Sequence, residues 1–151
     1  MPRTFLEDLA IGQKFASGRL QVDGESIKRF AAEFDPQPFH LDEQAAQKTV
    51  FRGLAASGWH TAALSMRMLV ESDFWSDDGM IGVDIEELHW PHPVRPGDEL
   101  HIEIEILAIQ PSKSKPGQGR VKIRVTTFNQ ADKVVQMYVA NILVLAHRKT
   151  P

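Results

Sequence analysis

The strongest constraint on the fold is a change of hydrophobic period halfway along the chain. In residues 100–106 and 121–125, apolar side chains alternate with charged or polar ones. This predicts strands that are buried on one face and exposed on the other. Residues 134–145 are apolar with little alternation, which is typical of a central strand covered on both faces. The stretch 110–119 holds two prolines and two glycines and predicts a loop between the first two strands.

The first half of the chain has helical spacing instead. Asp23 is a candidate N-cap for a helix that Pro36 ends, because a proline pushes the preceding residue out of the helical region. Asp42 is a candidate cap for a second, short helix that runs through Lys48. The longest predicted helix covers residues 59–74, and its apolar residues occupy so much of the circumference that we expect burial on several sides. A short strand is expected over residues 14–21.

This order of elements predicts an α+β domain, with helices first and a meandering antiparallel sheet afterwards. At a prior of roughly 150 residues per domain, the 151 residues form one domain, 1–151. The simplest packing lays the sheet around the long helix. One face and the edge strands then remain for a partner subunit, because open sheet edges need protection.

Composition excludes several classes of protein. Lys and Arg number 17 against 20 Asp and Glu, a net charge of −3, which argues against binding nucleic acid by neutralising phosphates. The absence of cysteine excludes disulfides, thiolate metal sites and cysteine nucleophiles. The most apolar stretch, 142–146, is far shorter than the roughly 20 residues of a membrane-spanning helix. We therefore expect a soluble, cytoplasmic protein with no membrane partner.

Residues 35–40 carry the most informative motif, Asp-Pro-Gln-Pro-Phe-His. Two prolines at alternate positions favour a tight turn that could bring the Asp35 carboxylate and the His40 imidazole together. Such a pair in an apolar setting suits general acid–base catalysis, since burial and mutual charge tune both pKa values. The structural alternative is that Asp35 makes a local turn bond and that His40 is a buried, hydrogen-bonded histidine.

A second motif lies at the mouth of the long helix, where Gly58 follows Ser57. A glycine there lets a ligand approach the backbone. The free N–H groups of a helix N-terminus attract negative charge that develops on a ligand. By itself this signal is weak, because glycine before a helix is common.

Four segments together resemble one family. They are DPQPFHLD at 35–42, AA at 45–46, GLAASG at 53–58 and PVRPGDEL at 93–100. In this order they resemble the MaoC-like dehydratases, which include the (R)-specific enoyl-CoA hydratases, and the resemblance runs roughly from residue 10 to 145. It implies the hotdog fold, in which a curved antiparallel β-sheet wraps a long central helix.

The resemblance also implies a hydro-lyase activity and the residues that carry it. Asp35 and His40 would be the catalytic pair, holding one water that adds to a trans-2-enoyl thioester or is eliminated from an (R)-3-hydroxyacyl thioester. The amide of Gly58 would bind the thioester carbonyl. The substrate would be an acyl-CoA or acyl-carrier-protein thioester, with no cofactor and no metal, and the protein would be a homodimer or higher homo-oligomer.

Three positions depart from the family pattern. Ser57 stands where the family has histidine, Gln37 stands where it has asparagine in the catalytic turn, and its active-site serine aligns near Met66. We count all three among the candidate substrate-binding positions. The orientation of His60, which follows Trp59, is left open by the sequence.

Two other functions stay open. A hotdog thioesterase would usually carry an acidic residue on the long helix, whereas the first carboxylate after Gly58 is Glu71. A non-catalytic protein that binds acyl-CoA or an acyl carrier is the second alternative, because the family's serine is missing. His89 and His92, two histidines three positions apart, do not by themselves predict a metal site. Trp90 is expected to pack against the long helix or a neighbouring subunit, and Pro96-Gly97-Asp98 to form a structural turn.

Overall fold

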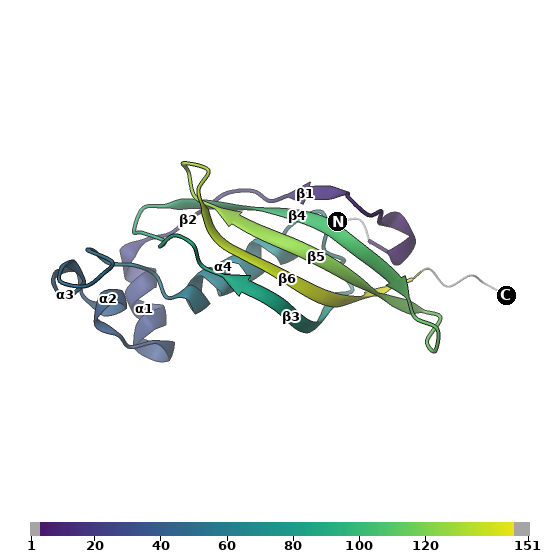
Figure 1. The fold of residues 1–151 in the computed structure, drawn as a ribbon, viewed down its shortest axis with the longest axis horizontal. Coiled ribbons are helices and arrows are strands. Elements are labelled where there is room, and N and C mark those ends of the chain that lie inside the picture. The colour runs from purple at the N-terminus through teal and green to yellow at the C-terminus, as the bar shows by residue number, and fades with distance from the viewer. Residues whose placement is uncertain (1–3, 147–151) are drawn as a thin grey trace.

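The computed structural model describes residues 4–146. One antiparallel sheet dominates it, in the order β1–β4–β5–β6–β3, and β2 also pairs with β4. The strands are β1 (Lys14–Ala16), β2 (Leu20–Gln21), β3 (Ile81–His89), β4 (Glu99–Pro111), β5 (Gln118–Phe128) and β6 (Val134–Leu145). The long strands curve along one face of the helix α4 (Gly58–Val70) (Figure 1). This is the α+β hotdog arrangement that the sequence and its resemblance predict.

The alternating residues behave as their period predicts. Leu100, Ile102, Ile104 and Ile106 of β4 are fully buried. The residues between them are half-buried, and the same alternation recurs in β5. β6 is buried along most of its length because it lies between β5 and β3. The apolar faces of these strands form the core under α4, which contacts β4 and β6.

Three short helices gather at one end of the sheet (Figure 1). They are α1 (Gly24–Phe34), α2 (Pro38–Leu41) and α3 (Glu43–Gln47), and a 3₁₀ turn, η1 (Leu6–Asp8), precedes β1. Both predicted caps are confirmed. Asp23 accepts a hydrogen bond from the Ser26 amide at 2.7 Å, and Asp42 accepts one from the Ala45 amide at 2.9 Å. α1 ends at Phe34, two residues before Pro36.

Several predicted boundaries were wrong. The long helix ends at Val70 rather than Phe74, because the Ser72 hydroxyl bonds the Leu69 carbonyl at 2.6 Å and closes the last turn. The strand predicted over 14–21 is two strands, β1 and β2, separated at residues 17–19. The loop predicted over 110–119 is shorter, because β4 runs on to Pro111 and β5 begins at Gln118.

The prediction that the long helix is buried on several sides is also wrong for a single chain, in which one side of the helix is exposed. Trp59, Met66 and Val70 are exposed on one side of α4. Next to the sheet core, the edge strand β3 exposes Ile81, Val83 and Ile85. The apolar residues around α4 therefore fall into two groups: one packs in the core of this chain, and the other forms part of an exposed apolar face.

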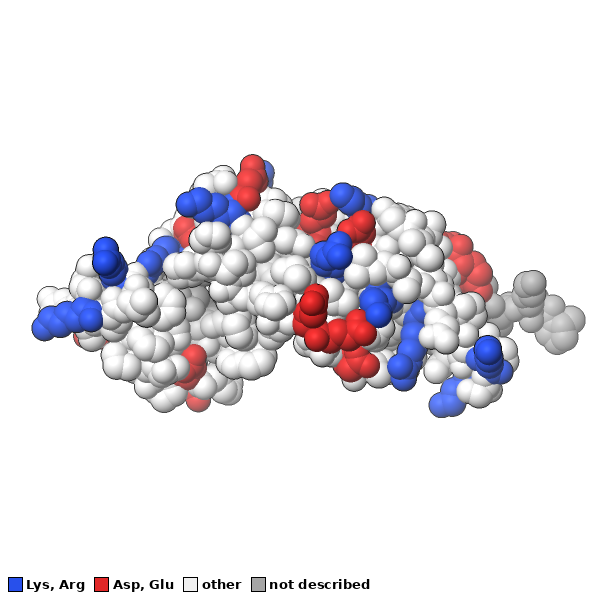
Figure 2. Space-filling model, in the orientation of Figure 1, with Lys and Arg blue, Asp and Glu red and all other residues white. Residues whose placement is uncertain are grey.

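Charges of both signs are interspersed over the side of the molecule that Figure 2 shows. Ion pairs join Lys122 to Glu86 at 3.0 Å and Arg124 to Glu105 at 2.9 Å. Within residues 4–146, no helix is both long and apolar enough to cross a membrane.

Candidate active site

The turn after α1 brings Asp35 and His40 together, as the sequence predicts. The Asp35 amide closes the last turn of α1 by bonding the Ala31 carbonyl at 2.9 Å. Pro38 is the first residue of α2, where its missing N–H costs nothing. His40 lies in α2 and not in an open turn, with its Nε2 atom 3.3 Å from Oδ2 of Asp35.

A hydrogen bond to a backbone carbonyl determines the tautomer of the neutral His40 ring. Its Nδ1 atom lies 2.6 Å from the carbonyl oxygen of Ala55, and the side chain is buried. A carbonyl oxygen only accepts, so Nδ1 carries the hydrogen in this bond. In the neutral ring Nε2 then presents its lone pair to Asp35. The site therefore places two acceptors face to face unless His40 is protonated.

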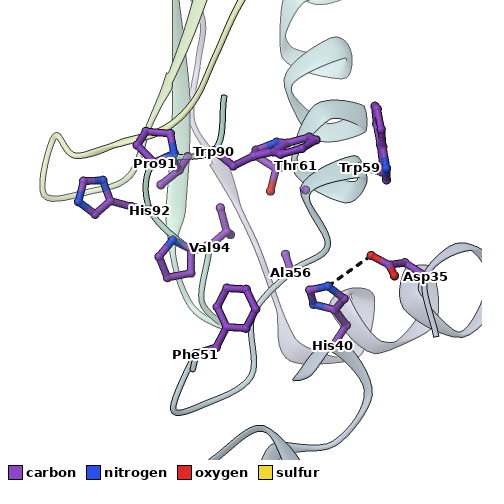
Figure 3. A pocket seen from close by; sticks show the side chains of 13 residues that line it. Asp35, His40, Phe51, Ala56, Trp59, Thr61, Trp90, Pro91, His92 and Val94 are labelled. Carbon is purple, nitrogen blue, oxygen red and sulfur yellow. Dashed lines mark ion pairs between the residues drawn. The ribbon is translucent and has the colours of Figure 1, made fainter. Parts of the chain in front are cut away.

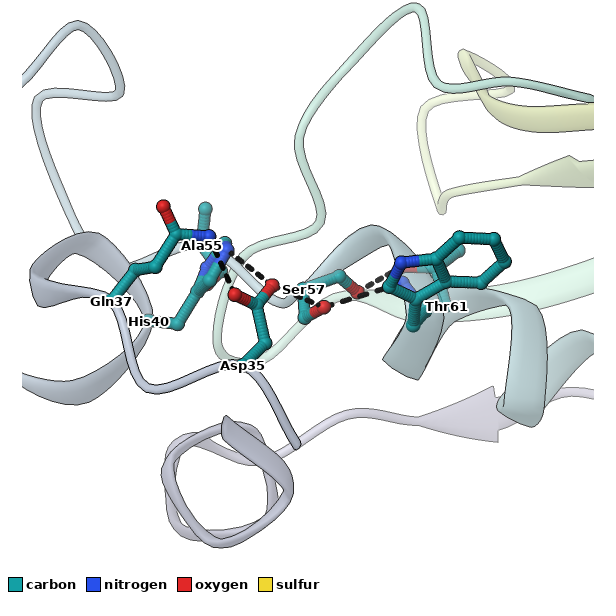
Figure 4. A network of polar contacts seen from close by, with 7 residues as sticks. Asp35, Gln37, His40, Ala55, Ser57 and Thr61 are labelled. Carbon is teal, nitrogen blue, oxygen red and sulfur yellow. Dashed lines mark hydrogen bonds and ion pairs between the residues drawn. The ribbon is translucent and has the colours of Figure 1, made fainter. Parts of the chain in front are cut away.

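The Asp35 carboxylate is held by two side-chain donors (Figure 4). The Ser57 hydroxyl donates to Oδ2 at 2.7 Å, and the Gln37 amide donates to Oδ1. Burial raises the pKa of Asp35, but the hydrogen bonds from Gln37 and Ser57 and the charge of His40 outweigh it, so the net pKa lies below its ordinary value. Asp35 is therefore a carboxylate at neutral pH.

Ser57 joins this pair to the mouth of α4. It is fully buried and is the N-cap of the helix, with its hydroxyl oxygen accepting from the Trp59 amide at 3.3 Å. Gly58 follows as the first helical residue, and among the described residues no partner is found for its amide. A Cβ atom at Gly58 would lie 2.6 Å from the Trp90 ring. Glycine is thus required here because the indole of Trp90 lies directly on the backbone.

A cavity of about 350 Å³ opens at these groups (Figure 3). Its lining includes the polar side chains of Asp35, His40, Thr61 and His92 together with Gly58, and Phe51, Trp90, Pro91 and Pro93 supply apolar walls. Its size falls at the lower end of the range for small-molecule sites. Among residues 4–146, no three His, Asp or Glu side chains cluster in a way that could hold a metal ion.

Two residues considered from the sequence lie elsewhere. Met66 does not line this cavity but a neighbouring apolar one. His60 turns toward α1, where its ring stacks on Phe30 at a centroid distance of 4.8 Å. Burial lowers the pKa of His60, and the positive charge of Arg29 lowers it further. His60 therefore stands outside the candidate site.

Sequence reasoning missed Thr61. It is buried and lines the cavity, and its hydroxyl lies a long 3.5 Å from the Ser57 carbonyl. The signal was available, because positions three apart share one face of a helix and Thr61 follows Gly58 by three. Ser65, beside Met66, is buried and bonds the Thr61 carbonyl and the Thr127 hydroxyl, which is a structural role.

Arg95 was the second omission. The expected turn is present, with Asp98 accepting from the Arg95 amide at 2.8 Å. The guanidinium group of Arg95 also bonds the carbonyls of Phe51, Gly53 and Leu54. Arg95 thereby holds the chain that leads to the Ala55 carbonyl. Trp90 packs on the mouth of the long helix, as predicted.

Comparison with known proteins gives one family. The family described as "MaoC like domain" matches residues 8–129. The uncharacterized protein YdeM of Bacillus subtilis (strain 168) is 37% identical over 143 residues, covering 95% of this chain and 99% of that protein.

Two solved structures extend this similarity. The MaoC-like dehydratase from Rhodospirillum rubrum is 53% identical, with a TM-score of 0.92, over 97% of this chain and 99% of that one. The unliganded (R)-hydratase PhaJ1 from Pseudomonas aeruginosa is 27% identical, with a TM-score of 0.76, over 99% and 94% of the two chains.

Replacing Ser57 tests the electrostatics of the site directly. In Ser57→Ala the carboxylate of Asp35 loses a donor to its charged form, so the pKa of Asp35 should rise. NMR titration of the Asp35 carboxyl carbon measures this shift. Ser65→Ala is the matched control, because Ser65 is a buried serine on the same helix whose hydrogen bonds go to Thr61 and Thr127. An unchanged Asp35 titration in Ser57→Ala would contradict the assignment.

Proposed function

The chain belongs to the MaoC-like domain family, and from this premise we propose that it is a hydro-lyase acting on acyl thioesters. It adds water to a trans-2-enoyl thioester or, in reverse, removes water from an (R)-3-hydroxyacyl thioester. Similarity to the MaoC-like dehydratase of Rhodospirillum rubrum and to an (R)-hydratase supports this reaction class. The carrier of the acyl group is coenzyme A or an acyl carrier protein.

One observation carries the proposal: two acceptors face each other in a cavity. Nε2 of neutral His40 and Oδ2 of Asp35 lie 3.3 Å apart, and a water molecule beside the pair, on the cavity side, can donate one hydrogen toward each of them. Such a water is oriented by both groups and presents its oxygen lone pairs to a substrate. If Asp35 and His40 had only a structural role, a direct hydrogen bond with a donor on one residue and an acceptor on the other would stabilise the fold more than two acceptors do.

Proton transfer then follows from the geometry. As the water oxygen bonds to C3 of the enoyl group, Nε2 of His40 takes one of its protons. The imidazolium so formed is stabilised by the Asp35 carboxylate beside it and by the Ala55 carbonyl at Nδ1. The proton passes to C2, and the water has supplied both the hydroxyl group and the new C–H bond. Elimination reverses these steps.

Gly58 supplies the remaining element. Attack at C3 moves negative charge onto the thioester oxygen, and a preorganised N–H donor at that oxygen lowers the barrier. Gly58 lines the cavity, and its amide lies at the positive end of α4, so we assign this amide to that oxygen. The reaction consumes only water and thioester, and the proposed mechanism uses no cofactor.

The thioesterase alternative gains no support from the site. Glu71, the first carboxylate after Gly58, lies at the far end of α4 and pairs with Arg67 at 3.0 Å. It does not line the cavity.

The pair can be tested by a double-mutant cycle. General acid–base groups contribute typically about 10²–10⁴-fold, so Asp35→Asn or His40→Gln should each remove most hydration of an enoyl-CoA. Because both groups act on one water, the double variant should be scarcely slower than either single one. Loss of the conjugated-thioester absorbance measures the rate.

Three results would overturn parts of this proposal. Multiplicative losses in the double variant would mean that the residues act independently. Near-normal turnover in both single variants would return the pair to a structural role. Binding of acyl-CoA without turnover of any enoyl thioester would favour the non-catalytic alternative.

We also infer a homodimer. The edge strand β3 exposes Ile81, Val83 and Ile85, and α4 exposes Met66 and Val70 on the same side as the apolar cavity. A long edge strand with apolar side chains is unfavourable in water unless another strand or chain covers it. A second copy that pairs through β3 would cover both elements.

The dimer can be tested by its mass in solution. The wild-type chain should have twice the monomer mass at micromolar concentration, measured by light scattering. Ile85→Lys should shift the mass toward the monomer, because it buries a charge in the interface. The control is Val50→Lys, a change at a residue 89% exposed and away from β3. A monomeric wild type would contradict the inference.

A further inference from the structure

Two cavities meet at one side chain. The cavity at Asp35 and His40 and a second one of about 340 Å³ are both lined by Trp59. No other described residue lines both of them. The indole therefore borders both the cavity of the catalytic groups and the second cavity.

The second cavity is suited to hydrocarbon. Its lining is largely apolar and includes Leu69, Tyr138 and Ile142. Met66 and Ile85 also line it, so the second copy of the chain inferred above would close this cavity from outside. Among the described residues that line it, Asp84 is the one ionisable group besides Tyr138, and it accepts a hydrogen bond from Asn141 at 2.7 Å. Such a cavity offers the acyl part of a thioester burial but offers little to its polar carrier.

Trp59 rests against a fixed neighbour. The rings of Trp59 and Trp90 meet edge to face, with centroids 5.4 Å apart, and Figure 3 shows both beside the first turn of α4. Trp90 cannot move freely, because its Nε1–H donates to Oε1 of the fully buried Gln136 at 2.8 Å and its ring lies on Gly58. Trp59 is 58% exposed. The two indoles thus form a wall in which Trp90 is held in place by its neighbours, whereas Trp59 is exposed and can be substituted without disturbing those contacts.

We propose that Trp59 is a specificity-determining residue that separates the apolar cavity from Asp35 and His40 and so restricts the enzyme to short acyl chains. This inference rests on the proposed hydratase function. Removing the indole joins the two cavities, and a longer acyl chain then gains the burial of its added methylenes. Each methylene buried in this way is worth about fourfold in kcat/KM.

The experiment compares chain-length preference in wild type, Trp59→Ala and Trp59→Phe. The readout is the ratio of kcat/KM for trans-2-octenoyl-CoA to kcat/KM for crotonyl-CoA, which does not depend on the fraction of active enzyme. In wild type this ratio should be below one. Trp59→Ala should raise it more than about tenfold. Trp59→Phe keeps an aromatic ring against Trp90 and should retain a ratio close to that of wild type.

The outcomes separate this inference from the function it rests on. If wild type hydrates the substrates but the octenoyl-to-crotonyl ratio of kcat/KM is the same in Trp59→Ala as in wild type, the proposed role of Trp59 is wrong and the hydratase function stands. No hydration of either substrate by wild type overturns the function. The Kd values of butyryl-CoA and octanoyl-CoA then decide on the proposed role of Trp59. It stands if Trp59→Ala tightens only octanoyl-CoA binding, and falls if the two Kd values change alike.

Discussion

The chemistry proposed for this site depends on one hydrogen bond, from Nδ1 of His40 to the carbonyl of Ala55. It decides which ring nitrogen is free and so makes Nε2 an acceptor opposite Asp35. The carbonyl is held from several directions. The Ala55 amide bonds the Phe39 carbonyl, the Ala56 amide bonds the Val94 carbonyl, and Arg95 binds the preceding loop. Segments far apart in the sequence thus converge on a single imidazole.

Ser57 links the start of α4 to the Asp35 carboxylate. One hydroxyl caps α4, through the Trp59 amide, and donates to Asp35. Together with Gln37 it keeps the pKa of Asp35 below its ordinary value despite partial burial. The carboxylate therefore stays ionised and can stabilise positive charge on His40. Ser57 and Gln37, which the resemblance suggested as substrate-binding residues, both donate to Asp35 and are not among the described residues that line the cavity, so we propose that they position Asp35.

Local signals in the sequence were enough for the framework of this fold. The alternation in β4 and β5 marked their buried faces, Asp23 and Asp42 marked two helix starts, and the prolines predicted the turn that joins Asp35 to His40. The contributions of Arg95 and Trp59 could not be predicted in this way. Arg95 acts on carbonyls more than forty positions away along the chain, and Trp59 matters because two cavities meet at its ring. Both depend on packing between distant segments, which no local pattern encodes.

The most direct test of this account is the tautomer of His40 in the free protein. Two-bond ¹H–¹⁵N NMR of the imidazole ring, recorded at a pH where the ring is neutral, distinguishes a hydrogen on Nδ1 from one on Nε2. We predict the Nδ1–H form, with Nε2 as the acceptor facing Asp35. A ring that carries its hydrogen on Nε2 would donate directly to Asp35. It would leave no pair of acceptors to orient a water, and the central claim would fail.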